Sequence, residues 1–91
     1  MFRVVWQPSA EQELALIWTL TEDRSRVAQA AARVDEMLSK TPISVGESRE
    51  GGMRIMFRSP LALDYHVNES MQIVTVLRVR WYDTGSDDEA Q

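Results

Sequence analysis

The sequence predicts an α+β domain in which a strand and two helices precede a meander of three antiparallel strands. Apolar residues recur at helical spacing within residues 10–40 and at alternate positions within residues 53–82, and turn-forming residues separate the segments. The chain has 91 residues, enough for one two-layer domain. The predicted order is therefore β-α-α-β-β-β, with the helical hairpin packed on one face of the sheet.

The N-terminal part of the sequence predicts the first strand and the first helix. Phe2, Val4 and Trp6 alternate with Arg3, Val5 and Gln7, which indicates a short strand that ends at Pro8. Ser9 and Gln12 have the spacing of a capping box, and an apolar stripe follows them. We therefore expect a helix over about residues 10–20.

The next segment predicts a second helix. Either Thr21 or Asp23 is suited to cap it, and it should end near Lys40, before Pro42. Its apolar stripe consists of Val27, Ala30, Ala31, Val34, Met37 and Leu38. A connection of about four residues makes the two helices an antiparallel hairpin.

The last third of the sequence predicts the rest of the sheet. Residues 41–52 have the composition of a loop, and tight turns at Ser59-Pro60 and near Asn68 separate three strands. The odd-numbered positions of these strands are almost all apolar. The even-numbered positions carry Arg54, Arg58, Asp64, His66, Arg78 and Arg80. Because side chains alternate along a strand, this pattern predicts an apolar face under the helices and an open face lined with arginine.

The charge distribution divides the chain into two parts. The net charge is −4, but residues 83–91 contain four acids and no base, and the rest of the chain is neutral. We expect a single domain over residues 1–82 and a disordered acidic tail over residues 83–91. Neither a signal peptide nor a membrane span is predicted, so we expect a cytoplasmic protein. With no cysteine and one histidine, we expect no cofactor and no metal.

The arginine pattern suggests a phosphate-binding surface. The planar guanidinium group suits phosphate, and histidine side chains, which ordinarily have a pKa of about 6.5, suit proton transfer near neutrality, which makes His66 a candidate. The alternative is a solvated sheet face in which Asp64 neutralises Arg54, Arg58 or Arg78. The three tryptophans, Trp6, Trp18 and Trp81, are expected in the core, although Trp81 and Tyr82 also suit stacking on a base or a partner.

With this order of elements, the chain resembles the RelE/ParE toxins of bacterial type II toxin-antitoxin systems. The resemblance covers about residues 2–80. The matching segments are Val4 to Trp6, Val34 to Leu38, Glu47 to Arg49, Gly52 to Ile55, Leu63 to Val67 and Ile73 to Val79. The resemblance implies an antitoxin partner and a role in growth inhibition and plasmid stabilisation.

The resemblance implies two activities and one alternative without activity. The first is a metal-independent endoribonuclease, an mRNA interferase that cuts mRNA in the ribosome. Its catalytic residues would be Arg54, Arg78, Arg80 and His66, and its substrate-binding residues would be Arg58, Trp81 and Tyr82. The second is a ParE-like inhibitor of DNA gyrase that hydrolyses nothing. Ala62 and Leu63 stand where several RNA-cutting relatives have an arginine, which keeps this reading open. The third possibility is an inactive relative that only binds an antitoxin.

Overall fold

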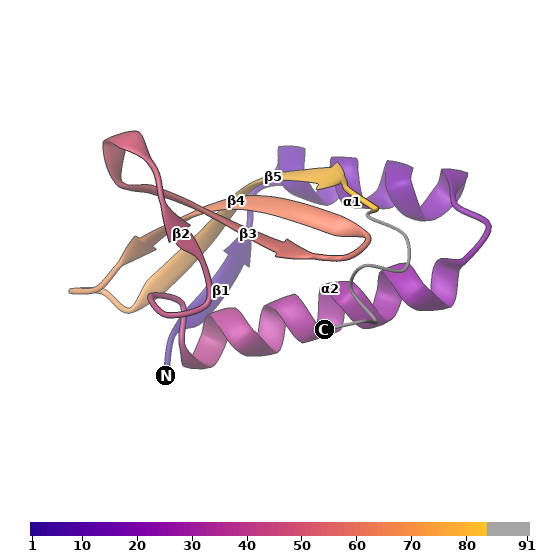
Figure 1. Cartoon of the computed structure of the whole chain (residues 1–91). Coiled ribbons are helices and arrows are strands. Elements are labelled where there is room, and N and C mark those ends of the chain that lie inside the picture. The colour runs from indigo at the N-terminus through magenta and orange to yellow at the C-terminus, as the bar shows by residue number, and fades with distance from the viewer. Residues whose placement is uncertain (84–91) are drawn as a thin grey trace.

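The computed structural model describes residues 1–83, so residues 84–91, most of the predicted acidic tail, lie outside the described part of the chain. The chain forms β1 (Arg3–Trp6), α1 (Pro8–Leu20), α2 (Arg24–Lys40), β2 (Glu47–Ser48), a 3-10 turn (Glu50–Gly52), β3 (Met53–Arg58), β4 (Leu61–Asn68) and β5 (Ile73–Trp81) (Figure 1). Within residues 1–83 no helix is both long and apolar enough to cross a bilayer.

The five strands form one sheet in the order β1-β5-β4-β3-β2. All neighbouring strands are antiparallel except β1, which runs parallel to β5. The predicted α+β class and the hairpin of helices on the sheet are confirmed (Figure 1). Two features were not predicted: the parallel pairing of β1, and the short strand β2 within the segment expected to be a loop.

The helix starts follow local chemistry that differs in part from the prediction. The expected capping box is wrong, because α1 begins at Pro8 and its N-cap, Gln7, makes no side-chain cap. Proline suits the first position of a helix, where its missing N–H needs no partner. In α2 the second expected cap is correct, since the carboxylate of Asp23 accepts the N–H of Arg26 at 3.1 Å. The helix ends at Lys40, as predicted.

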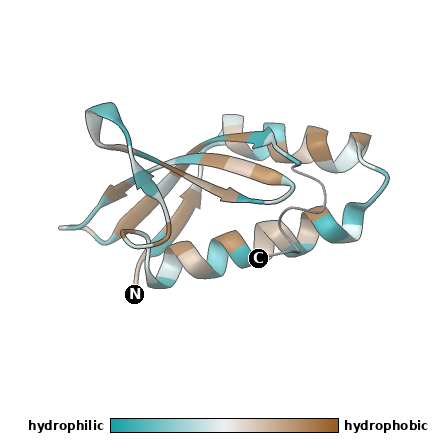
Figure 2. Ribbon diagram, in the orientation of Figure 1, coloured by the Kyte–Doolittle hydropathy of each residue, from teal (hydrophilic) through white to brown (hydrophobic). Residues whose placement is uncertain are grey.

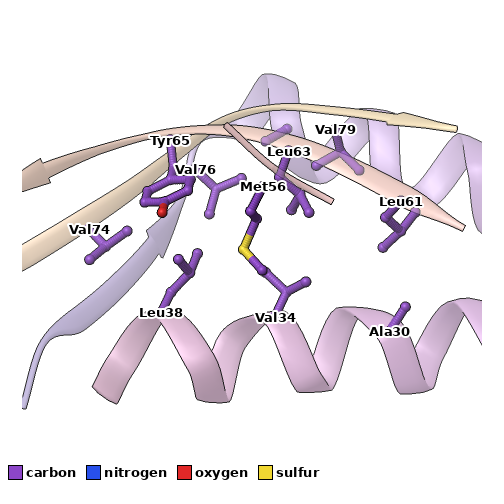
Figure 3. Close-up of a cluster of buried hydrophobic side chains, with 11 residues drawn as sticks. Ala30, Val34, Leu38, Met56, Leu61, Leu63, Tyr65, Val74, Val76 and Val79 are labelled. Carbon is purple, nitrogen blue, oxygen red and sulfur yellow. The ribbon is translucent and has the colours of Figure 1, made fainter. Parts of the chain in front are cut away.

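The core lies between α2 and the sheet. In Figure 3, Val34 and Leu38 of α2 point toward Met56 and Tyr65 of the sheet, and all four are at most 2% exposed. Figure 2 shows the same division, with hydrophobic residues in the middle strands and recurring along α2. The face of the sheet away from α2 is the open face.

The tryptophans lie closer to the surface than expected. Trp18 is 43% exposed and Trp81 is 48% exposed, so their predicted place in the core is wrong. Trp6 is half-buried, and its indole N–H donates to Asp35 at 3.1 Å. The guanidinium carbon of Arg24 lies 4.4 Å from the centre of the Trp18 ring, a cation–π geometry that fits a surface position.

Candidate functional site on the open face of the sheet

The predicted row of four arginines on one sheet face is wrong, and the cause lies in the turn between β3 and β4. That turn has two residues, so Arg58 opposes Leu61, and every pair across these strands joins an even position to an odd one. Opposed side chains share a face of the sheet. Arg54 therefore lies beside the buried Tyr65 on the helix-covered face, and Arg58 lies on that side as well.

A β-bulge sets the face of the remaining arginines. Asp64 opposes Arg78, but Tyr65 opposes Val76, which leaves Leu77 as the extra residue of β5. This shift lets Val76 enter the core, while Arg78 and Arg80 remain on the open face with Asp64. Only two of the four predicted arginines therefore share the open face.

Arg54, predicted as catalytic, binds the segment that leads into β2. Its guanidinium donates to the carbonyl oxygen of Gly46 at 2.8 Å, to Ser48 Oγ at 3.1 Å and to the carbonyl oxygen of Ile43. Its Nε lies 3.4 Å from the hydroxyl of Tyr65. Each acceptor is neutral and belongs to the chain itself, so this geometry gives Arg54 a structural role.

Tyr65 and Gly46 complete this anchor. The Tyr65 hydroxyl donates to the carbonyl oxygen of Pro42 at 2.7 Å. A Cβ at Gly46 would lie 2.2 Å from that hydroxyl oxygen and 2.9 Å from the carbonyl oxygen of Ile55. Only glycine fits this close approach, and the anchor holds the loop that carries β2 beside β3.

The remaining candidates form what we call the open-face site: Asp64, His66, Arg78 and Arg80 from the strands, with Arg49 and Glu50 from the turn before β3. A shallow hollow of about 500 Å³ lies within it and is lined by Arg49, Glu50, Met53, Ile55, Asp64 and Arg80. The site is open to solvent, and its floor is the middle of the sheet.

Each arginine of the open-face site is paired with an acid. Arg80 binds Asp64 through two hydrogen bonds, of 2.9 and 3.0 Å, and this pair is the most enclosed of the three. The expected partners of Asp64 were Arg54, Arg58 or Arg78, so that expectation is wrong. Arg80 reaches Asp64 because it opposes the small side chain of Ala62.

In the other two pairs, the acid lies outside β3, β4 and β5. Arg78 Nε lies 3.5 Å from Glu13 Oε2 of α1, and Arg49 Nη1 lies 3.2 Å from Glu47 Oε1. Glu13 also accepts the backbone N–H of Val79 at 2.7 Å, on the side of β5 where β1 has already ended. The carboxylate thus satisfies a strand-edge donor and an arginine together.

Sequence reasoning missed Glu13. The signal was its position within the apolar stripe of the first helix, between Ala10 and Ile17, where a charged residue is unusual. A charged residue at such a position is expected to have a specific partner.

His66 lies on the open face, exposed, opposite Met53. A Cβ at Gly52 would lie 3.5 Å from its Nε2, so the 3-10 turn lies close beside the imidazole. Gly52 has a φ of +77°, which a residue with a side chain rarely adopts. The proton-transfer role of His66 stays a prediction.

The aromatic pair at the end of β5 is divided between the two faces. The rings of Tyr82 and Phe57 lie 4.8 Å apart and are tilted by 48°. Trp81 opposes the buried Leu61 and lines a hollow with Ile17 of α1, on the helix side of the sheet. The substrate-binding roles of Arg58, Trp81 and Tyr82 stay predictions. Arg58 and Trp81 flank Leu61 on the helix side, whereas Tyr82 packs on Phe57.

The comparisons with known proteins agree with this fold. No family model and no curated protein matches the sequence. Among solved structures, the RelBE2 toxin-antitoxin complex of Mycobacterium tuberculosis contains a chain that is 25% identical with a TM-score of 0.72, covering 88% of this chain and 96% of that one. The YoeB/ParE toxin of Agrobacterium tumefaciens is 20% identical with a TM-score of 0.70, covering 88% and 98%.

A third match is the isolated RelE toxin of E. coli, which is 18% identical with a TM-score of 0.64 and covers 99% of this chain and 93% of its own. These structures match nearly the full length of the described fold, and the M. tuberculosis chain also shares a quarter of its residues with this one. The chain therefore has the fold of the RelE/ParE toxins of toxin-antitoxin systems.

Proposed function

We propose that the chain is the toxin of a type II toxin-antitoxin pair and that it inhibits a protein target by binding, without hydrolysis. The observation that carries this proposal is that Arg49, Arg78 and Arg80 are each paired with a carboxylate. DNA gyrase is the target that the resemblance to ParE toxins implies.

The charge balance of the open-face site supports binding over RNA cleavage. Attack of a 2′-hydroxyl on a phosphate builds negative charge in the transition state, which needs cations that are not already neutralised. Three arginines here lie among four acids, Glu13, Glu47, Glu50 and Asp64. An incoming phosphate would have to displace carboxylates and then lie near them.

Ribosome-dependent mRNA cleavage is the second candidate. It is favoured by the position of His66 on the same face as Arg80, beside a hollow that is open enough to admit a nucleotide. In this case Arg80 would release Asp64 on binding the phosphate, and His66 would move the proton.

One experiment separates the two candidates. The chain is induced alone in bacteria, and transcript ends and DNA breaks are mapped in the same culture. The proposal predicts DNA breaks with intact transcripts, and purified chain should inhibit gyrase supercoiling. Cut transcripts with unaffected gyrase would support the second candidate and reject the first.

An antitoxin partner is part of either candidate, because two of the matched solved structures are described as complexes of a toxin with its antitoxin. Two surfaces of the chain are suited to bind an antitoxin. β2 forms a sheet edge that a partner strand can extend. A hollow of about 640 Å³ lies between α1 and α2 and is lined by Leu14, Trp18 and Val27 among others. Co-expression with the protein of a neighbouring reading frame, followed by co-purification, tests this assignment.

A further inference from the structure

A small basic cleft lies on the helix-covered side of the sheet, between α2 and the turn that joins β3 to β4. Its volume is about 280 Å³. The residues that line it are Arg26, Gln29, Ala30, Arg33, Arg58 and Ser59. Three of these six are arginines and none is an acid. We call it the α2 arginine cleft.

The spacing of the helix residues explains the shape of the cleft. Arg26, Gln29 and Arg33 recur at three and four residues and so lie on one face of α2. Arg26 and Arg33 are two helical turns apart, about 10 Å along the axis. Arg58 stands across from them at the end of β3, because its pairing with Leu61 places it on the helix side.

One end of the cleft already binds a carboxylate. Arg26 donates to both oxygens of Asp83 at 3.0 Å, in the bidentate geometry that guanidinium groups form with carboxylates. The same guanidinium donates to Ser59 Oγ at 2.8 Å, which fixes its orientation. Asp83 follows the last strand, so the occupant of this end is an aspartate from an irregular stretch of chain.

The other end of the cleft has capacity for more acid. Within residues 1–83, Arg58 makes no ion pair and no side-chain hydrogen bond, and it is exposed. Arg33 has one partner, Glu36, in a pair that is about half exposed on both sides. Such exposed pairs contribute at most about 1 kcal/mol, so a ligand can compete for Arg33.

We propose that the α2 arginine cleft binds an extended acidic segment of a partner protein. Asp83 keeps Arg26, and the acidic segment places its carboxylates against Arg33 and Arg58 at the other end of the cleft. A nucleic acid is disfavoured, because residues 1–82 carry no net charge and give a long polyanion no further attraction beyond the cleft, whereas a short acidic segment needs only the cleft. This inference uses no residue of the open-face site, so it goes beyond the proposed function and does not depend on it.

The test measures binding of a fluorescein-labelled hexaglutamate peptide to the full chain at low salt by fluorescence anisotropy. Arg58→Gln and Arg33→Gln should each weaken binding by about fivefold, the effect of losing one exposed ion pair. Arg3→Gln is the matched control, because Arg3 is also exposed, has no acidic partner within residues 1–83, and lies on the open face. This control should bind like the parent, and added salt should weaken binding in all of them.

Three results would overturn the proposal. The first is an equal loss in Arg3→Gln and Arg58→Gln, which would mean attraction by any surface arginine. The second is equal binding of a hexaglutamine peptide. The third is a single-stranded oligonucleotide that binds more tightly than hexaglutamate and loses affinity in Arg58→Gln, which would assign the cleft to nucleic acid. All three variants replace exposed side chains, so their melting temperatures should match that of the parent. A difference in binding then does not come from loss of the fold.

Discussion

Replacing Arg54 by alanine should destabilise the fold, because Arg54 anchors the loop before β2. The substitution removes hydrogen bonds to the carbonyl oxygens of Ile43 and Gly46 and to Ser48 Oγ. It also leaves the buried hydroxyl of Tyr65 without its guanidinium neighbour. If Arg54 instead served catalysis alone, its loss would abolish activity and leave stability unchanged.

The magnitude follows from these contacts. A hydrogen bond to a charged group contributes about 1.5–3 kcal/mol, and water replaces part of that at a half-buried site. About 2 kcal/mol of side-chain entropy is recovered when the arginine is removed. The expected net loss in the free energy of unfolding is therefore about 2–4 kcal/mol, equivalent to a fall in Tm of about 10 °C or more for a domain of this size.

Urea unfolding of the full chain, followed by far-UV circular dichroism, measures this loss. Arg58→Ala is the matched control: it lies on the same strand and the same side but has no partner within residues 1–83, so its effect should be below about 0.5 kcal/mol. Amide exchange in residues 41–52 should accelerate in Arg54→Ala only. Equal stability of the two variants would refute the anchoring role.

Three further predictions concern other contacts. Gly46→Ala should destabilise by about 2 kcal/mol or more, since its Cβ would meet the hydroxyl of Tyr65, and Tyr65→Phe should relieve part of this loss in a double-mutant cycle. Glu13→Ala should cost about 1–2 kcal/mol by leaving the N–H of Val79 unpaired, whereas Glu13→Gln keeps an acceptor and should cost less; equal losses would contradict this. The pKa of Glu36 should lie below its usual value in an NMR titration, chiefly because the lysine one turn later donates a hydrogen bond to it. Since folding lowers the pKa of Glu36, this carboxylate stabilises the fold above its unfolded-state pKa, and the stabilisation is lost as the pH falls through the folded-state pKa. An ordinary pKa for Glu36 in the folded chain would contradict this prediction.

The fold was largely predictable because each element has a local signature. The apolar stripe of residues 27–38 and the ends of α2 follow from helical period and capping. β2 has only two residues and no pattern of its own, since it forms by pairing with β3. The parallel contact of β1 with β5 joins distant segments, and alternation within one strand does not reveal which strand it pairs with.

The candidate site was less predictable because it depends on register. A two-residue turn places even positions of one strand opposite odd positions of the next, and this rule alone moves Arg54 and Arg58 off the face of Arg80. The bulge at Leu77 then reverses parity within a single strand, and no residue type there signals it. The pairing of Arg80 with Asp64 depends on this second shift, which sets the register of β5 against β4.

The most direct test asks which face of the sheet carries the biological effect. Three chains are induced in bacteria: the parent, the double variant Arg78→Ala/Arg80→Ala, and Arg58→Ala. Growth is followed at matched protein levels. We expect growth arrest to be lost in the open-face double variant and kept in Arg58→Ala. Arrest that survives the double variant, or disappears in Arg58→Ala, would contradict the assignment of the open face.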